Sequence, residues 1–304
     1  MKPSLEVKNI YKRLDGFILS NISFDLKEGE IILVGGKNGA GKTKLLETIS
    51  CISPPSKGYI SYFGETVFKD KILKNRLIKT NHRLGVQIQD ERLFGSLTVE
   101  EIFETLSSLY GVKDYERYYS DCPHIKGELQ KRVNTLSDGK KQLIKFLLSI
   151  GHDPDIILLD EPTSYLDGDV RNWVFNKVKS LSSEGKSFII SLNQFWDIGD
   201  IADRLIILKD GQIENIIHDF KDFYNGSAIS IQTIFKDGSE SVLKDIASSD
   251  SHVISRSEKK SIRIITKYDI KTIKDEFDIE DKYIIRFSRP YLEDFYRLRG
   301  GYKY

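Results

Sequence analysis

One segment constrains the fold of this chain more than any other. Residues 36–43 read GKNGAGKT, which matches the pattern G-x-x-x-x-G-K-[ST]. The segment follows an apolar run, 31–34, and leads into a stretch with helical spacing, 42–49. A strand before such a loop and a helix after it form a phosphate cradle, because the backbone N–H groups and the helix N-terminus face the phosphates. The sequence therefore predicts a nucleotide-binding chain.

Each residue type in this loop has a physical role toward a phosphate group. Glycine lets the backbone approach an oxygen atom, because no Cβ stands between them. Lys42 is expected to neutralise the terminal phosphates, and the Thr43 hydroxyl is expected to hold Mg²⁺. The residues expected to contact the nucleotide are Gly36, Asn38, Gly39, Ala40, Gly41, Lys42 and Thr43.

A pair of carboxylates follows a second apolar run. Residues 156–159 read IILL, as in a fully buried parallel strand, and Asp160 and Glu161 come next. Open α/β sheets bind ligands at the carboxyl ends of their strands. Asp160 is therefore expected to be an outer partner of Mg²⁺, and Glu161 to poise a water molecule for attack on a γ-phosphate. The alternative is a solvated loop start, which the phosphate-binding loop disfavours.

A third segment, 136–140, reads LSDGK and precedes an apolar-rich stretch that runs through Ile150. Ser137 and Gly139 could bring a hydroxyl, N–H groups and a helix end to a phosphate. The same residues also fit an ordinary helix N-cap. Both interpretations stay open at the level of the residues.

The composition excludes several classes of protein. The 304 residues include 46 basic and 45 acidic side chains, for a net charge of +1, so we expect no nucleic-acid partner. No run of about eighteen uncharged apolar residues occurs and the N-terminus lacks a signal-peptide core, so the chain is not expected to cross a membrane by itself. Cys51 and Cys122 match no metal-binding spacing, fit a reducing cytosol and are expected to be buried.

Apolar patterns predict the core of a first domain, residues 1–218. Segments with short alternating patterns are expected to form an antiparallel β subdomain: 5–10, 16–26 and 58–67. Uninterrupted or strand-like apolar runs are expected to form the mixed sheet of the core: 31–34, 156–159, 188–190 and 204–208. The predicted fold class is therefore α/β, of the P-loop NTPase type.

Two further parts are predicted around this core. Helical spacing over 99–119, with Ile102, Phe103, Leu106 and Leu109 on one side, predicts a helical subdomain within about 90–135. A second, small α+β domain is expected over 219–304. Its strand candidates are 228–235, 262–265 and 283–287, with a hairpin signal at 236–238 and a helix that has Pro290 in its first turn.

With these motifs in order, residues 5–218 resemble the ATP-binding cassette ATPases, the motor subunits of ABC transporters. Residues 136–140 take the place of the family signature LSGGQ, Gln89 matches the glutamine of the Q-loop, and 161–167 match the D-loop. The resemblance implies ATP and Mg²⁺ as cofactors, with Gln89 contacting Mg²⁺ and relaying to the membrane partner. It also implies a head-to-tail dimer, in which each ATP lies between one chain's P-loop and the Ser137 and Gly139 of the other.

The resemblance further implies partners and a location. The partners would be separate membrane-spanning permease subunits and a second ATPase chain, in a homodimer or a heterodimer. The chain would be cytoplasmic, and peripheral on the inner face of the cell membrane through the permease. Residues 287–296 resemble the closing segment of drug-export and sodium-export type ATPases, which favours an exporter.

Several positions depart from the family pattern. Asn193 stands where the family has a catalytic histidine, so it can hydrogen-bond the γ-phosphate but cannot carry a proton, which predicts slow hydrolysis. Asp138 replaces a signature glycine and places a negative charge near a partner's nucleotide. The aromatic residue that stacks on adenine would fall near Leu14, so Phe17 or Tyr11 is expected to substitute.

Three hypotheses follow for the function. The leading one is an ATP-hydrolysing subunit that powers an exporter through ATP-gated dimerisation. The second is a weakly hydrolysing, regulatory half of a heterodimeric ABC complex. A soluble cassette protein of translation or repair is the third, and it is disfavoured because the chain has neither a second cassette nor a long coiled coil. The region after about 220 is expected to serve dimer contacts or regulation.

Overall fold

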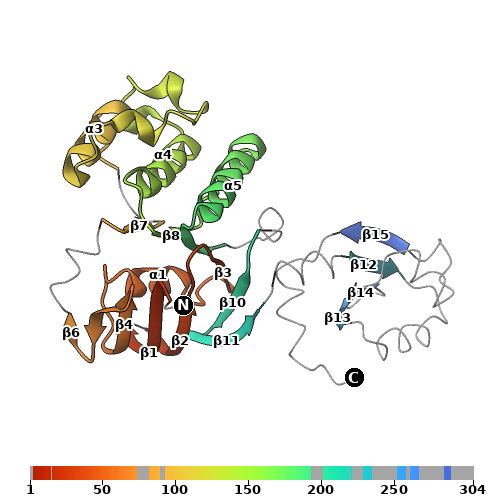
Figure 1. Ribbon diagram of the computed structural model, residues 1–304. Helices are drawn as coiled ribbons and strands as arrows, with labels where there is room; N and C mark the ends of the chain where they lie inside the picture. The colour runs from red at the N-terminus through yellow and green to blue at the C-terminus, as the bar shows by residue number, and fades with distance from the viewer. Residues whose placement is uncertain are drawn as a thin grey trace. The chain divides into compact units, whose positions relative to one another are not determined.

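The computed structural model describes the core of the chain and the backbone of four later strands (Figure 1). The described residues are 3–14, 16–73, 82–89, 93–192, 201–218, 220, 229–234, 252–257, 261–266 and 284–288. The chain forms two compact units, the first comprising residues 1–193 and 202–218 and the second comprising 194–201 and 219–304.

A mixed six-stranded sheet forms the centre of the first unit. Its strands in spatial order are β11 (Gln212–Ile217), β10 (Arg204–Lys209), β3 (Ile31–Gly35), β9 (Ser187–Ser191), β8 (Ile156–Asp160) and β7 (Leu84–Gln87). Neighbours from β10 to β7 pair in parallel, and β11 is antiparallel to β10. Every residue of β3, β8 and β9 is buried, as their uninterrupted apolar sequences predict.

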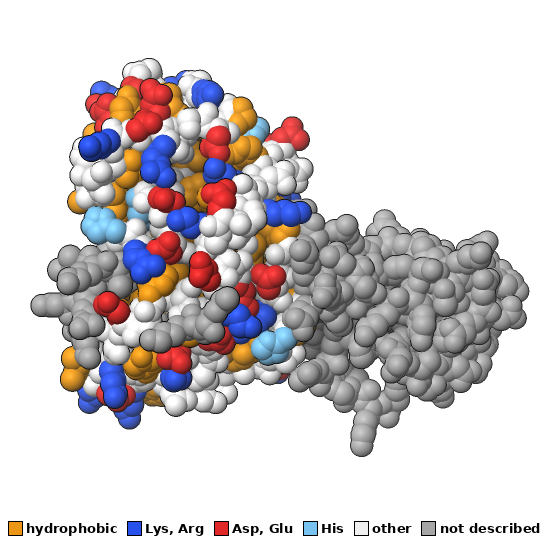
Figure 2. Space-filling model, in the orientation of Figure 1, with side chains coloured by type: hydrophobic (Ala, Val, Ile, Leu, Met, Phe, Trp, Pro, Cys, Tyr) orange, Lys and Arg blue, Asp and Glu red, His pale blue; other side chains and the backbone are white. Residues whose placement is uncertain are grey.

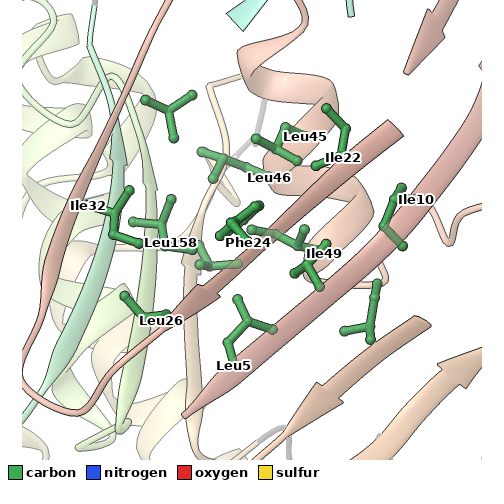
Figure 3. Packing of buried hydrophobic residues seen from close by; sticks show 14 of the residues in the cluster. Leu5, Ile10, Ile22, Phe24, Leu26, Ile32, Leu45, Leu46, Ile49 and Leu158 are labelled. Carbon is green, nitrogen blue, oxygen red and sulfur yellow. The ribbon is translucent and has the colours of Figure 1, made fainter. Parts of the chain in front are cut away.

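A second, antiparallel sheet covers one side of this core. Its strands in spatial order are β2 (Phe17–Leu26), β1 (Leu5–Leu14), β4 (Lys57–Tyr62), β5 (Glu65–Lys69) and β6 (Ile72–Leu73). The antiparallel β subdomain predicted from alternating residues is thus confirmed, with the hairpin between β4 and β5 turning at Phe63 and Gly64. Buried side chains of both sheets pack around Leu45, Leu46 and Ile49 of the helix α1 (Figure 3).

Four α-helices lie in the described part of the first unit: α1 (Lys42–Ile49), α3 (Val99–Tyr110), α4 (Asp138–Gly151) and α5 (Gly168–Ser183). Three short 3-10 helices precede α4: η1 (Tyr115–Tyr118), η2 (Lys126–Glu128) and η3 (Val133–Thr135). In Figure 1, α4 and α5 lie on the side of the mixed sheet opposite to α1. No helix among the described residues is both long and apolar enough to span a bilayer.

The helical insert predicted within about 90–135 contains α3 and three 3-10 helices, but α3 is shorter than the spacing over 99–119 predicts. A capping box starts α3 at Thr98, and Gly111 ends it with a φ of 68°, so the expected continuous helical spacing over 99–119 is wrong beyond residue 110. Leu109 was expected on the packed side of the helix, yet it is 69% exposed. Buried positions of the same helix include Ile102 and Phe103, as predicted.

A buried ion pair joins the two sheets. Arg204, at the start of β10, donates two hydrogen bonds to the carboxylate of Glu30, from Nε to Oε1 and from Nη2 to Oε2, the second over 2.7 Å. Its Nη1 also donates to the Asp25 carboxylate in β2 over 3.4 Å. Burial acts to lower the pKa of Arg204, but the hydrogen bonds and charge of Glu30 outweigh it and raise that pKa. Removing one partner of such a pair typically costs about 3–5 kcal/mol.

Both thiols lie in the core of the first unit. Burial raises the pKa of Cys51 to about 12 and the pKa of Cys122 to about 11. The two side chains are free cysteines, and both are buried, as the sequence predicts. At neutral pH both sulfurs are therefore protonated and act as small apolar groups.

The second unit contains a four-stranded antiparallel sheet. Its strands in spatial order are β13 (His252–Ser257), β14 (Ser261–Thr266), β12 (Ile229–Ile234) and β15 (Ile284–Ser288). The strands predicted at 228–235, 262–265 and 283–287 are confirmed, whereas β13 was not predicted. The hairpin signal at 236–238 and the helix expected at Pro290 lie outside the described residues.

An aromatic stack joins the helical insert to the end of α4. The ring of His152 stacks on Tyr110 with centroids 4.0 Å apart, and its Nε2 lies 3.2 Å from the carbonyl oxygen of Leu84 in β7. Burial lowers the pKa of His152 from its ordinary value of 6.5. The neutral imidazole is therefore the form that the folded chain favours.

This shift predicts a pH-dependent loss of stability. The contribution of His152 to the free energy of unfolding is complete above pH 6.5 and is lost as the pH falls from there through the lowered pKa of the folded state. The reason is that the unfolded chain binds the proton at a higher pH than the folded chain does. We expect the melting temperature to fall between about pH 7.5 and about pH 5.5, and to fall less in His152→Phe. The exposed His218→Gln is the control. Equal pH dependence in all three proteins would contradict the assignment.

Candidate nucleotide-binding site

The glycine-rich loop lies between β3 and α1, as predicted, and two of its glycines have left-handed backbone. The φ angle is 83° at Gly39 and 104° at Gly41. Gly41 is the N-cap residue of α1 and has no side chain to cap the helix. The first N–H groups of α1 therefore face the open side of the loop without a side-chain cap, which favours an anion at this end of the helix.

A cavity of about 500 Å³ opens over this loop. It is lined by Leu14, Phe17, Asn38, Gly39, Gly41, Lys42, Thr43, Lys44, Gln89 and Glu161. The structure thus brings most of the predicted site residues to one cavity, although they come from four separate segments of the chain. Three of the predicted residues, Gly36, Ala40 and Asp160, do not line it.

Lys42 is held as a buried cation at the floor of the cavity. It is only 6% exposed, and its Nζ donates to the carbonyl oxygen of Gly36 over 2.9 Å. Burial lowers the pKa of Lys42, while the charges of Glu161 and Asp160 act to raise it. An anion in the cavity would offset the cost of burying this charge.

Asp160 joins three elements at the carboxyl end of β8. Its Oδ2 accepts a hydrogen bond from the Thr43 hydroxyl over 2.7 Å, and its Oδ1 accepts one from the hydroxyl of Ser191 in β9. The Thr43 and Asp160 oxygens lie together next to the cavity, which fits the few protein oxygens that Mg²⁺ takes beside phosphates and water. Among the described residues no cluster of three or more metal-binding side chains occurs.

Glu161 has an unusual backbone that several contacts fix. Its φ is 48°, in the left-handed region. Its N–H lies 3.1 Å from both the carbonyl oxygen and the hydroxyl of Ser191, and its carbonyl oxygen accepts from Nε2 of Gln142 over 2.8 Å. The Ser164 hydroxyl lies 3.1 Å from Glu161 Oε2. Non-glycine residues persist in this conformation only where the surroundings over-determine it, which happens most often at functional sites.

Phe17 is the aromatic residue at this cavity. The ring packs on Gly41, where an added Cβ would lie 2.5 Å from its Cζ. Phe17 and Leu14 also line an adjoining cavity of about 420 Å³, together with Arg13, Gly16, Ile18, Gly39 and Asp210. Tyr11, the other candidate for stacking on adenine, lines neither cavity. The geometry therefore favours Phe17.

The segment 136–140 lies away from the chain's own phosphate-binding loop. Ser137 is the N-cap of α4 and accepts from the N–H of Lys140 over 3.4 Å, and Gly139 packs so tightly that a Cβ would lie 2.7 Å from the carbonyl oxygen of Tyr165. Neither Ser137 nor Gly139 lines the cavity over the loop. A different cavity, of about 540 Å³, includes Asp138, Tyr165 and also Gln89 in its lining.

The sequence did not identify three residues that shape the site. Ser191, Gln142 and Ser164 contact Asp160 or Glu161 through hydrogen bonds between segments or across a turn. The apolar pattern of β9 indirectly indicated Ser191, because this residue ends the strand and is paired with Asp160 at the same edge of the sheet. Asn193, predicted as a catalytic residue, lies outside the described residues.

A buried strand, a glycine-rich turn and a helix with this geometry define a P-loop nucleotide-binding protein. The sequence pattern of the ABC transporter family matches residues 19–164. An uncharacterised ABC transporter ATP-binding protein of Methanocaldococcus jannaschii is 31% identical over 218 residues, which cover 70% of this chain and 76% of that protein. The chain therefore belongs to the family of ABC transporter ATP-binding proteins.

Other similar proteins support the fold and broaden the family context. The Nod factor export ATP-binding protein I of Burkholderia orbicola is 28% identical over 214 residues, 68% of each chain. The dimeric structure of the bacterial ABC transporter cassette MJ0796 superposes with a TM-score of 0.62 at 24% identity, over 70% of this chain and 98% of that one. Relatives named for import and relatives named for export both occur.

Two glycines of the loop allow a matched test of its packing. Gly39→Ala adds a Cβ where no atom lies within 4 Å, so only the left-handed backbone opposes it, at about 1–2 kcal/mol. Gly41→Ala also pushes the new Cβ into Phe17, which should cost about 1–3 kcal/mol more. We expect urea unfolding to show the larger loss for Gly41→Ala. Equal losses would mean that Phe17 does not pack on the loop.

Proposed function

We propose that this ABC transporter ATP-binding protein binds ATP with Mg²⁺ and hydrolyses it to drive membrane-spanning partner subunits. One observation carries the proposal. A cation, a hydroxyl and a carboxylate line one cavity, supplied by Lys42, Thr43 and Glu161, and the Thr43 hydroxyl is bonded to the Asp160 carboxylate. These are the groups that phosphoryl transfer requires, because its catalysis rests on positioning and charge stabilisation.

Each residue has a separate role in the proposed reaction. Lys42 stabilises charge on the terminal phosphates, and the backbone N–H groups at the start of α1 bind phosphate oxygens. Thr43, Asp160 and Gln89 would hold Mg²⁺, which neutralises charge on the phosphates when bound. Glu161 lines the cavity and orients the attacking water molecule. Phe17 provides a face for the adenine ring.

Two substitutions separate binding from turnover. Lys42→Ala should weaken ATP binding by about tenfold to a hundredfold, because a charge-assisted hydrogen bond is worth about 1.5–3 kcal/mol. Glu161→Gln should keep ATP affinity and lower the hydrolysis rate by about 10²–10⁴. Equilibrium nucleotide binding and phosphate release measure the two effects, with the exposed Lys57→Ala as control. Unchanged turnover in Glu161→Gln would overturn the role of that residue.

A second chain is part of the proposal. Ser137 and Gly139 do not line their own chain's cavity, so their contact with a nucleotide would have to come from another copy or a related ATPase chain. The Asp138 side chain is 75% exposed beside them, with Lys141 Nζ 3.5 Å from its carboxylate. A negative charge at this position would face the phosphates of the neighbouring chain's ATP and weaken ATP-driven association.

The charge of Asp138 has opposite effects on association and on stability. Asp138→Gly should strengthen ATP-dependent self-association, measured by sedimentation with Glu161→Gln as the background to prevent turnover. It should also remove about 0.3–1 kcal/mol of favourable charge at the N-terminus of α4. Asp169→Gly, which removes an acid from the first turn of α5, is the matched control. Stronger association in both variants, or in neither, would contradict a specific role for Asp138.

The regulatory half of a heterodimer is the second candidate, and Asp138 favours it. In such a pair, the segment 136–140 of this chain, with the repulsive charge of Asp138, would contact one ATP, and Asn193 would contact the other. Hydrolysis by this chain would then be slow. Purified chain alone and chain mixed with a second ATPase subunit should then differ in turnover. Rapid turnover by this chain alone would contradict this alternative.

Export and membrane association form the finer part of the proposal. The likeness of residues 287–296 to export-type ATPases supports export, and membership of the transporter family supports permease partners at the inner face of the membrane. The second unit, with its separate antiparallel sheet, would serve dimer contacts or regulation. Transport assays in vesicles containing the permease test the direction directly.

A further inference from the structure

We propose that Gln142 is a positioning residue for Glu161, and that it couples the start of α4 to the hydrolytic carboxylate. The inference rests on the proposed function, because it assigns a consequence to the carboxylate that poises water. It goes beyond that function by naming a side chain that does not line the cavity over the phosphate-binding loop. The juxtaposition that carries it is a partly buried hydrogen bond between α4 and the backbone of Glu161.

The first observation is the backbone conformation of Glu161. With φ at 48°, its peptide departs from the regions that non-glycine residues prefer, and the conformation needs outside support. Ser191 supports the N–H side of the residue through two oxygens, each 3.1 Å away. On the carbonyl side, the N–H of Ser164 lies 3.1 Å from the carbonyl oxygen within the same turn.

Gln142 supplies a further contact on the carbonyl side. Its Nε2 lies 2.8 Å from the Glu161 carbonyl oxygen, and its side chain is 7% exposed. Ser164 belongs to the same turn as Glu161, and Ser191 belongs to the neighbouring strand. Gln142 is thus the contact that comes from α4, the helix whose N-cap is Ser137.

The geometry implies a mechanical link. A rotation or shift of α4 changes the position of the Gln142 amide, and the Glu161 carbonyl oxygen must follow or lose this partly buried hydrogen bond. Loss of that bond leaves the left-handed peptide with less support, so it can relax and turn the carboxylate away from the cavity. A small movement at the start of α4 would therefore change the rate of hydrolysis while the phosphate-binding loop stays intact.

The test is a substitution that keeps the volume of Gln142 and removes its donor. Gln142→Met should lower the hydrolysis rate at saturating ATP by tenfold or more, with ATP affinity within about threefold of the wild type, because the bond acts on the carboxylate and not on binding. Gln212→Met is the matched control, since Gln212 is an exposed glutamine whose Nε2 donates to Ser20 over 2.9 Å. Gln142→Glu, which keeps the length and loses the donor, is the second variant should Gln142→Met not fold.

A double-mutant cycle separates positioning from a structural role. If Gln142 acts through Glu161, adding Gln142→Met to Glu161→Gln should cause little further loss of turnover. A general weakening of the fold would instead lower turnover in both backgrounds and reduce ATP affinity. Losses that multiply in the double variant, or a parallel loss of affinity, would overturn the inference.

The outcome also distinguishes this inference from the proposed function. Wild-type protein without Glu161-dependent ATP hydrolysis would overturn the function, and the role of Gln142 would fall with it. Wild-type protein whose turnover depends on Glu161 but is unchanged by Gln142→Met would overturn the role of Gln142 alone. A loss of turnover in Gln142→Met with affinity retained supports both.

Discussion

The buried carboxylate of Asp160 is the constraint on which the rest of the site depends. It accepts one hydrogen bond from Thr43 at the start of α1 and one from Ser191 at the end of β9, so one side chain fixes three elements relative to each other. A buried charge of this kind is tolerated only where partners satisfy it. The adjacent Lys42, whose pKa burial lowers, supplies the opposite charge. The loop is thus preorganised for an anion before any ligand arrives.

Left-handed backbone occurs at several turns of the described residues, and some of these positions lie at the site. Besides the loop glycines, Glu161 has a φ of 48° and Tyr165 a φ of 67°, and the Tyr165 carbonyl oxygen lies against Gly139 of α4. These positions link the end of β8 to the start of α4 over a few residues. The face in Figure 2 shows basic and acidic side chains interspersed over the described part, with no broad surface of one charge.

The sequence predicts the sheets well because buried parallel strands require uninterrupted apolar runs, and β3, β8 and β9 all have them. It also predicts the loop, whose residues are contiguous. Side-chain contacts between distant segments leave no periodic signal, so Gln142 and Ser191 emerge only when α4, β8 and β9 come together. The predicted length of the first helix of the insert was wrong for a local reason: Gly111 adopts the left-handed conformation that ends α3.

The two buried cysteines have a practical consequence for spectroscopy. Cys51 and Cys122 are the whole cysteine content of the chain, and the raised pKa of both thiols keeps them protonated and shielded at neutral pH. Thiol-directed probes react with the thiolate of accessible residues. A cysteine introduced at an exposed position such as Ile52 or Leu109 would therefore accept a fluorophore or spin label selectively. Movements of the helical insert can be followed in the natural background, without removing either native thiol.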